Sequence, residues 1–230
     1  MKKHLLRFLL GAACVLLFIG HAAKFWQIPF VNVVDAYLYD VRVRLSAPNT
    51  KDERVVIVDI DERSLAEVGR WPWSRNVLAT MVQKLVADYR VAVLGFDVVF
   101  AEPDESSGLK VLEQIGQDQL HGDREFQSTL QSLRGHLDYD RLFAAALRDR
   151  PIVLGYYFSG LDEARQGGAL PRPVFPPGFF QSRRISTISW NGFGGNLKEF
   201  QDAAASGGHF NPLVDFDGVS RRVPMIVEYK

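Results

Sequence analysis

Acidic side chains stand near the ends of two apolar segments of this 230-residue chain. Asp59 and Asp61 end the first segment, and Asp97 lies towards the end of the second. If both segments are parallel strands, these carboxylates lie at the carboxyl ends of neighbouring strands, where open α/β sheets bind ligands. A divalent cation held by carboxylate oxygens would remove their mutual repulsion. Asp59, Asp61 and Asp97 are therefore weak candidates for metal ligands.

A purely structural interpretation of the same acids is favoured. Arg63, Arg70 and Arg75 stand close by in the sequence and can neutralise the carboxylates as ion pairs, without any ligand. Asp61 also precedes a short apolar-periodic stretch, where an aspartate caps the first turn of a helix.

The run Gly69-Arg70-Trp71-Pro72-Trp73-Ser74-Arg75 is the second group of residues that could carry chemistry. Trp71 and Trp73 could form the aromatic wall of a pocket in which Arg70 or Arg75 grips an anion. The favoured alternative is the start of a helix, with Ser74 as its N-cap and Trp73 in a hydrophobic staple. Taken together, the candidate ligand-binding residues are Asp61, Arg70, Trp71, Trp73, Arg75 and Asp97.

The rest of the chain adds no catalytic motif. The five histidines lack the spacing of a metal site, and no phosphate-binding loop, serine-nucleophile elbow or kinase signature is found in the sequence. The pair Arg221-Arg222 is interpreted as two solvated charges on a hairpin, with an anion grip as the alternative. No catalytic residue and no cofactor are expected.

Alternating strand and helix patterns must position these residues. Strands are predicted over 55–60, 91–100 and 152–158, because each is an apolar run rich in β-branched or aromatic side chains. Helices are predicted over 32–45, 62–68, 75–86 and 140–148 from apolar residues three and four apart. This order predicts an α/β fold with a mainly parallel central sheet and crossover helices.

Two segments interrupt or extend that pattern. Residues 105–137 form a polar insertion with weak helical periodicity, and residues 160–200, rich in proline and glycine, form a surface excursion. The chain then ends in a predicted antiparallel hairpin, whose arms lie over 209–214 and 222–229 around the Asp215-Phe216-Asp217-Gly218 turn.

The first 30 residues predict the topology. They hold four basic residues and no acidic one, whereas the remaining 200 residues hold four more acids than bases. Residues 1–7 are predicted to be a cytoplasmic basic flank, 8–30 a transmembrane helix and 31–230 an extracytoplasmic domain. A cleaved signal peptide is the alternative. The acidic balance of the larger part argues against nucleic-acid binding.

From about Asp35 to its end the chain resembles the type-two CHASE family of extracytoplasmic sensory domains. The resemblance rests on Val55–Ser64, Gly69–Arg75, Gly95–Phe100, Asp138–Leu147 and the Asp-Gly-Val-Ser-Arg-Arg core within Gly208–Pro224. It implies a non-catalytic input domain in the inner membrane of a bacterium, facing the periplasm. It further implies a homodimer and a cytoplasmic output, a nucleotide cyclase or a kinase, that this chain lacks. The chain is therefore expected to be a C-terminally truncated receptor with an unidentified ligand.

Two other functions remain as alternatives. Asp59-Ile60-Asp61 is similar to the paired aspartates of haloacid-dehalogenase phosphohydrolases, which would make Asp59, Asp61 and Asp97 metal-dependent catalytic groups. Arg63, however, stands where that pattern has threonine or valine. The other alternative is a membrane-anchored interaction domain without a small ligand.

Overall fold

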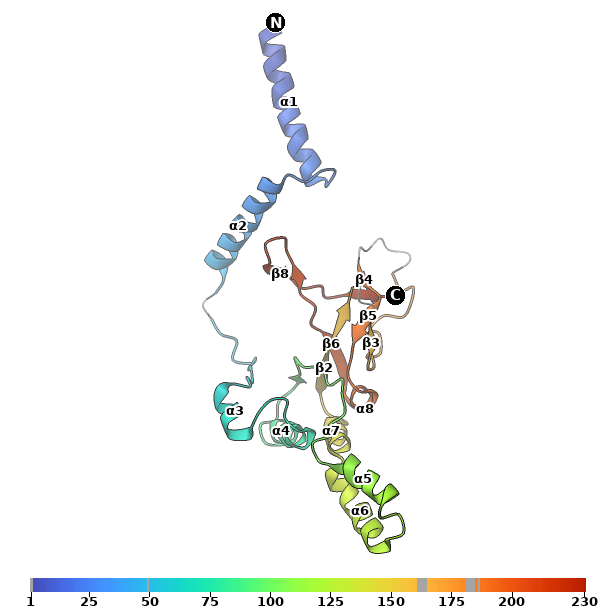
Figure 1. The fold of residues 1–230 in the computed structure, drawn as a ribbon. Helices are drawn as coiled ribbons and strands as arrows, with labels where there is room; N and C mark the ends of the chain where they lie inside the picture. Colours follow the sequence, from blue (N-terminus) through green and yellow to red (C-terminus); the bar gives the residue numbers. More distant parts are fainter. Residues whose placement is uncertain (1, 49, 161–164, 181–184, 186) are drawn as a thin grey trace. The chain divides into compact units, whose positions relative to one another are not determined.

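The computed structural model describes residues 2–48, 50–160, 165–180, 185 and 187–230 (Figure 1). It divides into two units, Met1–Asp59 and Ile60–Lys230, and each is described by itself. The first unit is helical, and the second combines helices with a mixed β-sheet. The chain is thus an α/β protein that begins with an apolar helix.

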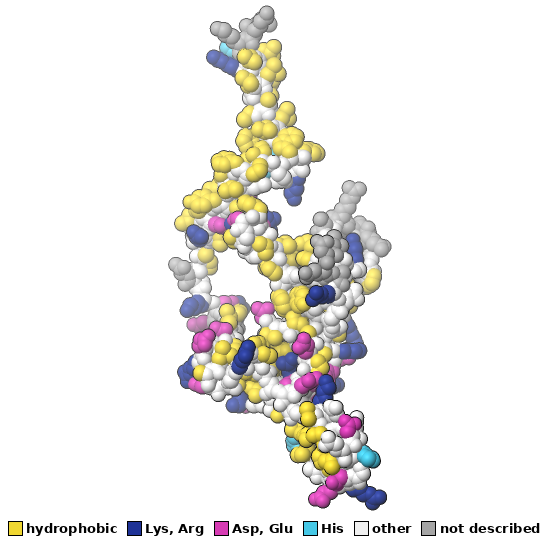
Figure 2. All heavy atoms as spheres, viewed as in Figure 1, with side chains coloured by type: hydrophobic (Ala, Val, Ile, Leu, Met, Phe, Trp, Pro, Cys, Tyr) yellow, Lys and Arg dark blue, Asp and Glu magenta, His cyan; other side chains and the backbone are white. Residues whose placement is uncertain are grey.

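Two helices make up most of the first unit. α1 spans Lys2–Ala22 and α2 spans Pro29–Ser46. Figure 2 shows hydrophobic side chains along the visible face of α1. Within the described residues, His4–Ala22 is the one helical stretch long and apolar enough to cross a bilayer, a property that a signal sequence shares.

A tight connection joins α1 to α2. Lys24 has a positive φ of 63°, which turns the chain just after α1 ends at Ala22. The indole Nε1 of Trp26 donates a hydrogen bond of 3.0 Å to the carbonyl oxygen of Leu17. Its ring lies so close to Gly20 that a Cβ built there would be 2.0 Å from it. The tryptophan therefore folds back onto the helix that precedes it.

The prediction of a strand over 55–60 is wrong. These residues form irregular chain, and Val55, Val56 and Ile57 are 72%, 78% and 88% exposed. β-branched side chains favour an extended backbone, but a strand forms only where a partner edge supplies hydrogen bonds. Among the described residues, none supplies such an edge to this segment.

The second unit begins with two helices that match their predictions. α3 spans Glu62–Val68, and the Asp61 carboxylate caps it by accepting the Ser64 N–H at 2.8 Å. Gly69 ends α3 with a φ of 111°, in the region that favours glycine. α4 follows over Arg75–Ala87 and buries Leu78, Ala79 and Val82, of which Leu78 and Val82 belong to the apolar stripe that predicts this helix.

β2, Ile152–Ser159, is the central strand of a mixed five-stranded sheet. The parallel strands β1 (Leu94–Gly95) and β6 (Ser206–His209) pair with its first half. The antiparallel strand β5 (Gly192–Gly194) pairs with its second half, and β3 (Gln166–Gly167) lies parallel to β5. Three of these four pairings are parallel, in agreement with a mainly parallel sheet.

The sheet departs from its prediction in two places. Of the strand predicted over 91–100, only Leu94–Gly95 pairs with a neighbour, although the chain beyond it still buries Phe100. The predicted surface excursion instead contributes β3 and β5 to the central sheet. Its glycines permit this close pairing, since a Cβ on Gly195 would lie 2.4 Å from the carbonyl oxygen of Ala169.

The core lies where α4, α7 (Tyr139–Leu147) and α8 (Lys198–Ala203) cover the sheet. Phe143 of α7 stands edge-on to Phe100 and Phe200, with ring centroids 5.0 Å and 5.1 Å apart. α7 was predicted from its apolar periodicity, whereas α8 was missed because it is only six residues long.

The predicted polar insertion is a pair of helices, α5 over Leu109–Asp118 and α6 over Arg124–Leu137. Gly116 permits their close approach, because a Cβ there would meet the ring of Phe126 at 3.1 Å. The side-chain amide of Gln127 also donates to the Gly116 carbonyl oxygen at 2.7 Å.

The C-terminal hairpin is confirmed in a shorter form. β7 (Leu213–Val214) and β8 (Ser220–Arg222) pair antiparallel around a turn in which Gly218 has a φ of 81°. The outer parts of the predicted arms pair elsewhere. His209 belongs to β6, and β9 (Val227–Tyr229) runs parallel to β4 (Ile188–Trp190).

Candidate functional site

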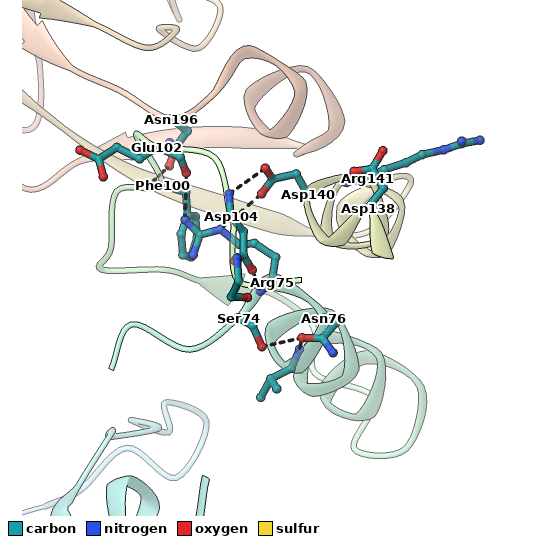
Figure 3. A network of polar contacts seen from close by, with 12 residues as sticks. Ser74, Arg75, Asn76, Phe100, Glu102, Asp104, Asp138, Asp140, Arg141 and Asn196 are labelled. Atoms are coloured by element: carbon teal, nitrogen blue, oxygen red, sulfur yellow. Dashed lines mark hydrogen bonds and ion pairs between the residues drawn. The ribbon is translucent and has the colours of Figure 1, made fainter. Parts of the chain in front are cut away.

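A buried arginine at the start of α4 is the centre of the candidate site (Figure 3). Arg75 is only 9% exposed. Its guanidinium carbon lies 4.7 Å from the ring centroid of Phe100, and Nη2 donates to the Glu102 carbonyl oxygen at 3.3 Å. A charge held in the core must be balanced by acidic or polar partners, since its removal from water is costly.

Two carboxylates supply that balance from separate segments. Asp104, in the chain between β1 and α5, accepts the backbone N–H of Arg75 through Oδ2 at 2.6 Å. Asp140, in the first turn of α7, accepts the N–H of Asp104 through its own Oδ2 at 2.9 Å. Figure 3 shows this chain of contacts running from α4 through Asp104 to α7. Three segments far apart in the sequence are therefore tied together.

This network corrects the predicted cap of α4. Ser74 occupies the N-cap position, but its hydroxyl contacts the side-chain oxygen of Asn76 rather than a backbone N–H. Asn76 Oδ1 accepts the N–H of Val77, and Asp104 accepts that of Arg75. The carboxylate that binds the helix start thus comes from a residue 29 positions later, which local sequence rules cannot anticipate.

The remaining Arg75–Asp140 contact is incomplete. Arg75 Nε and Asp140 Oδ1 lie 3.8 Å apart, within ion-pair range but beyond a hydrogen bond. Both atoms are buried, and neither has a hydrogen-bond partner. Side-chain exposure is 10% for Arg75 and 13% for Asp140, so water screens this pair only weakly.

Burial dominates the electrostatics of the pair. It lowers the pKa of Arg75, although the charges of Asp140 and Asp104 act in the opposite direction. It also raises the pKa of Asp140, against the Asp104 N–H and the Arg75 charge. Asp104 differs from its neighbour. Burial would raise its pKa, but hydrogen bonds from Ser106 and from the Arg75 backbone outweigh it and lower the pKa.

A further acid, Glu199 of α8, belongs to the same electrostatic environment. Partial burial raises its pKa, and the negative charges of Asp140 and Asp138 raise it further. Asp138 itself caps α7 by accepting the Arg141 N–H at 3.0 Å. Negative charge therefore gathers where α7 and α8 begin.

An open cavity of about 530 Å³ lies beside these acids. Residues of α5, α6 and α7 line this cavity, together with the segment that carries Asp104. Two of its basic residues are already paired, Lys110 with Glu105 at 2.6 Å and Arg134 with Glu113. These ion pairs neutralise Glu105 and Glu113, whereas Asp104, Asp138 and Asp140 also line the cavity.

The structure separates the candidate ligand-binding residues into two groups. Trp71 and Trp73 pack against the core, edge-on to each other with ring centroids 5.7 Å apart, as the structural interpretation of that motif requires. Arg75 is buried in the network described above. Asp61, Arg70 and Asp97 are exposed, and Asp61 serves as the cap of α3.

The weak metal candidates are not brought together. In the part of the chain that the structure describes, no three acidic, histidine or cysteine side chains are placed to share a metal ion. Asp59, Asp61 and Asp97 therefore form no such group. The interpretation of Arg221 as a solvated charge also needs correction. Its side chain is only 8% exposed, and its Nη1 contacts Asp215 at 3.0 Å.

Sequence reasoning missed the acids that surround Arg75. Asp104 is not among the candidate residues that the sequence offers, and Asp140 enters only as the first residue of a predicted helix. Asn196, fully buried, was not recognised at all. The one available signal was Asp138 and Asp140 at the start of an otherwise apolar helix, and that signal also fits simple capping.

Comparison with known proteins gives one match. A family model described as the CHASE2 domain matches residues 11–230, which is nearly the whole chain. Neither the curated proteins nor the solved structures contain a match to this chain. CHASE2 is a family of extracellular sensory domains of signalling receptors, and its members are not catalytic in themselves.

Proposed function

The chain belongs to the CHASE2 domain family, and we propose that it is the extracytoplasmic input domain of a bacterial transmembrane receptor. In this proposal its signal passes through membrane helices to a cytoplasmic output, a nucleotide cyclase or a kinase, that lies outside this chain. The observation that carries the proposal is the family match over residues 11–230, together with the apolar helix His4–Ala22 at one end.

The proposed orientation rests on charge. Lys2, Lys3 and Arg7 precede or begin the apolar stretch, and basic residues are retained on the cytoplasmic side of inner-membrane helices. Residues 31–230 then lie in the periplasm. If the head were instead a cleaved signal peptide, the same residues would be exported without an anchor.

Reporter fusions test this topology. We expect alkaline phosphatase fused after Lys230 to be active, because that enzyme matures only in the periplasm, and green fluorescent protein at the same position to be dark. A fusion before Met1 should give the opposite result. The intact mass of the purified chain distinguishes an anchor from a cleaved signal peptide. Fluorescent C-terminal fusions with inactive phosphatase would contradict the proposed function.

Ligand contacts are proposed at the exposed members of the predicted set, Asp61, Arg70 and Asp97. A ligand shifts a receptor only by binding its two states with different affinity, so loss of a contact should change the response. We expect Asp97→Asn to change the output of the full-length receptor while the far-ultraviolet circular dichroism and the melting temperature stay unchanged. Asp88→Asn, an exposed aspartate at the end of α4, is the matched control. A wild-type response of Asp97→Asn to every stimulus would remove this assignment.

A homodimer is proposed through α2. None of its residues is buried, yet Phe30, Val34, Tyr37, Val41 and Leu45 recur three or four positions apart. Such a stripe along a helix next to a membrane anchor matches the apolar seam of a two-stranded coiled coil. A second copy of the same helix would cover it.

A further inference from the structure

A proline-rich loop after β3, residues 172–180, carries an aromatic cluster outside the core. Phe175, Phe179 and Phe180 contact one another, with ring centroids 4.8 Å to 5.0 Å apart. None of these three rings belongs to the hydrophobic core of the described residues. Phe179 is 49% exposed, and Val174, which precedes the first of the rings, is 86% exposed. The loop therefore presents packed apolar side chains to the solvent, and we call it the aromatic loop.

The base of the aromatic loop is fixed to the central sheet. Just before the loop, β3 pairs with β5. The ring of Pro171 packs so closely on β6 that a Cβ built on Gly207 would lie 2.9 Å from it. Inside the loop, the Phe179 N–H donates to the Pro176 carbonyl oxygen at 3.1 Å, and Gly178 has a φ of 79°. The prolines restrict the backbone further, so a partner would bind a preformed surface at little cost in ordering entropy.

The loop lies in a basic part of the sequence. Residues 165–190 contain four arginines and no acid. Arg165 and Arg172 are exposed, and among the described residues no acid pairs with either. Glu228 lies on β9, the strand beside β4, but it is itself paired with Lys230 at 3.6 Å. The two acids that immediately precede residue 165 lie outside the described residues. The positive charge of Arg165 and Arg172 is therefore available to an anionic partner.

Exposed aromatic rings next to unpaired arginines match the surface of an anionic bilayer. Aromatic side chains favour the headgroup region, where their rings leave water, and arginine attracts lipid phosphate. An acidic protein would match the charge equally well. The chain itself favours the lipid, because the stretch His4–Ala22 is long and apolar enough to cross a bilayer. Such an anchor keeps the membrane at a high effective concentration around the domain.

We propose that the aromatic loop is a second membrane contact, which docks onto anionic lipid headgroups on the periplasmic face of the bilayer that holds α1. In this contact Val174 and Phe179 enter the interface, and Arg172 binds lipid phosphate. The inference rests on the anchored topology of the proposed function and is independent of its output. The domain is then held to the membrane at two points, and the second point depends on the anionic lipid content.

The test uses the full chain in nanodiscs, with Cys14→Ser to remove the native thiol. A cysteine introduced by Val174→Cys carries a nitrobenzoxadiazole fluorophore, and its quenching by doxyl-labelled lipid measures its proximity to the bilayer. Val111→Cys, at a 60% exposed valine of α5, is the matched control. In nanodiscs that contain phosphatidylglycerol, quenching at position 174 should exceed quenching at position 111 by about two-fold or more. Equal quenching at the two positions would overturn the inference.

Two variants measure the charged and the apolar contributions in the Val174→Cys background. Arg172→Gln should lower the quenching in phosphatidylglycerol nanodiscs by about half, and added salt should act in the same direction. Phe179→Ser should lower it in every lipid, because it removes a ring from the interface. Arg124→Gln, at an exposed arginine of α6, is the control and should have no effect. Equal quenching in phosphatidylcholine and phosphatidylglycerol nanodiscs would contradict the role of anionic lipid.

The same samples distinguish the remaining outcomes. A blue shift of the fluorophore that grows with the number of chains per nanodisc, without doxyl quenching, would assign the loop to a protein contact and overturn the lipid contact. An incorporated chain without preferential quenching would refute the loop alone and leave the proposed function standing. A chain that separates from lipid during reconstitution would refute the anchor, and with it both the proposed topology and this inference.

Discussion

At the scale of single residues, the domain depends on polar side chains buried among aromatic rings. Arg75 contacts Phe100 and lies 5.9 Å from the ring centroid of Phe200, so its charge stays in the core without access to bulk water. The interactions of this charge with neighbouring charged groups are strong, because little solvent is present to screen them. Arg75, one of the candidate ligand-binding residues, connects three segments of its own domain.

Asn196 illustrates the same principle without a charge. It is fully buried, its Oδ1 accepts the Phe100 N–H at 2.8 Å, and its Nδ2 donates to the Gly155 carbonyl oxygen at 3.0 Å. One amide thereby joins the chain after β1 to the central strand. Both backbone groups would lose a partner if this side chain were removed.

We therefore expect Asn196→Ala to lower the free energy of unfolding by about 2–5 kcal/mol, since each unsatisfied buried group costs about 1–3 kcal/mol. Urea denaturation of the full chain, followed by tryptophan fluorescence, measures the change. Gln131→Ala, at an exposed position of α6, is the matched control and should shift the midpoint little. Equal midpoints for the two variants would show that the Asn196 bonds contribute nothing.

At the scale of elements, periodicity predicted the helices well and the strands poorly. In α4 and α7 apolar residues recur three and four positions apart, which marks a buried face whatever the helix packs against. A strand needs a partner, and pairing depends on residues far away in the sequence. This is why 55–60 is unpaired, why 91–100 contributes only Leu94–Gly95, and why β5 and β6 were not anticipated.

The site was harder to predict than the fold for a related reason. Trp71, Trp73 and Arg75 are easily noticed in the sequence, because two tryptophans and an arginine so close together are rare. Asp104 and Asp140 have no local mark, and 36 positions separate them. Only the packing of α7 beside α4 brings them to Arg75, and packing is a property of the folded chain.

α2 is the element whose exposed stripe supports the proposed homodimer. Replacing Val34 and Val41 by glutamate places like charges in the seam and should abolish dimer cross-linking of the chain in membranes. Val43→Glu, two positions from Val41 and therefore on the far side of α2 from the proposed stripe, controls for added acidity and should leave cross-linking intact. Persistent cross-linking of the Val34→Glu/Val41→Glu variant would exclude this surface as the dimer contact.

At the scale of the whole molecule, ionisable groups of opposite behaviour share one fold. Arg221 contacts Asp217 at 2.7 Å and lowers the pKa of that carboxylate to about 2. Asp217 therefore stabilises the folded state at pH values above 3.8, the ordinary pKa of an aspartate, and this contribution is lost as the pH falls towards 2. Asp140 and Glu199 act in the reverse sense, so acid strengthens one part of the domain before it weakens another.

His209 adds a third contribution. It stands beside Tyr156 and Phe158, its Nδ1 is buried without a partner, and burial lowers its pKa below 6.5. The unfolded chain then takes up a proton more readily than the folded one, so stability is lost as the pH falls through 6.5. When the pH is lowered from 7.5 to 5.5, we expect the melting temperature of His209→Phe to fall less than that of the wild type. His121→Phe, in an exposed loop, should follow the wild type, and identical curves for all three proteins would refute this role.

The fold-back of Trp26 onto Gly20 has a mechanical consequence. A flexible linker between α1 and α2 would let each helix rotate independently, so a rotation of one helix would not be passed to the other. Instead, Trp26 donates a hydrogen bond to Leu17, and its ring packs against Gly20, where there is no side chain. These contacts hold the connection between α1 and α2 in a bent conformation. Rotation of α2 about its own axis would then move α1 sideways, so a rotation of α2 is converted into a lateral displacement of α1.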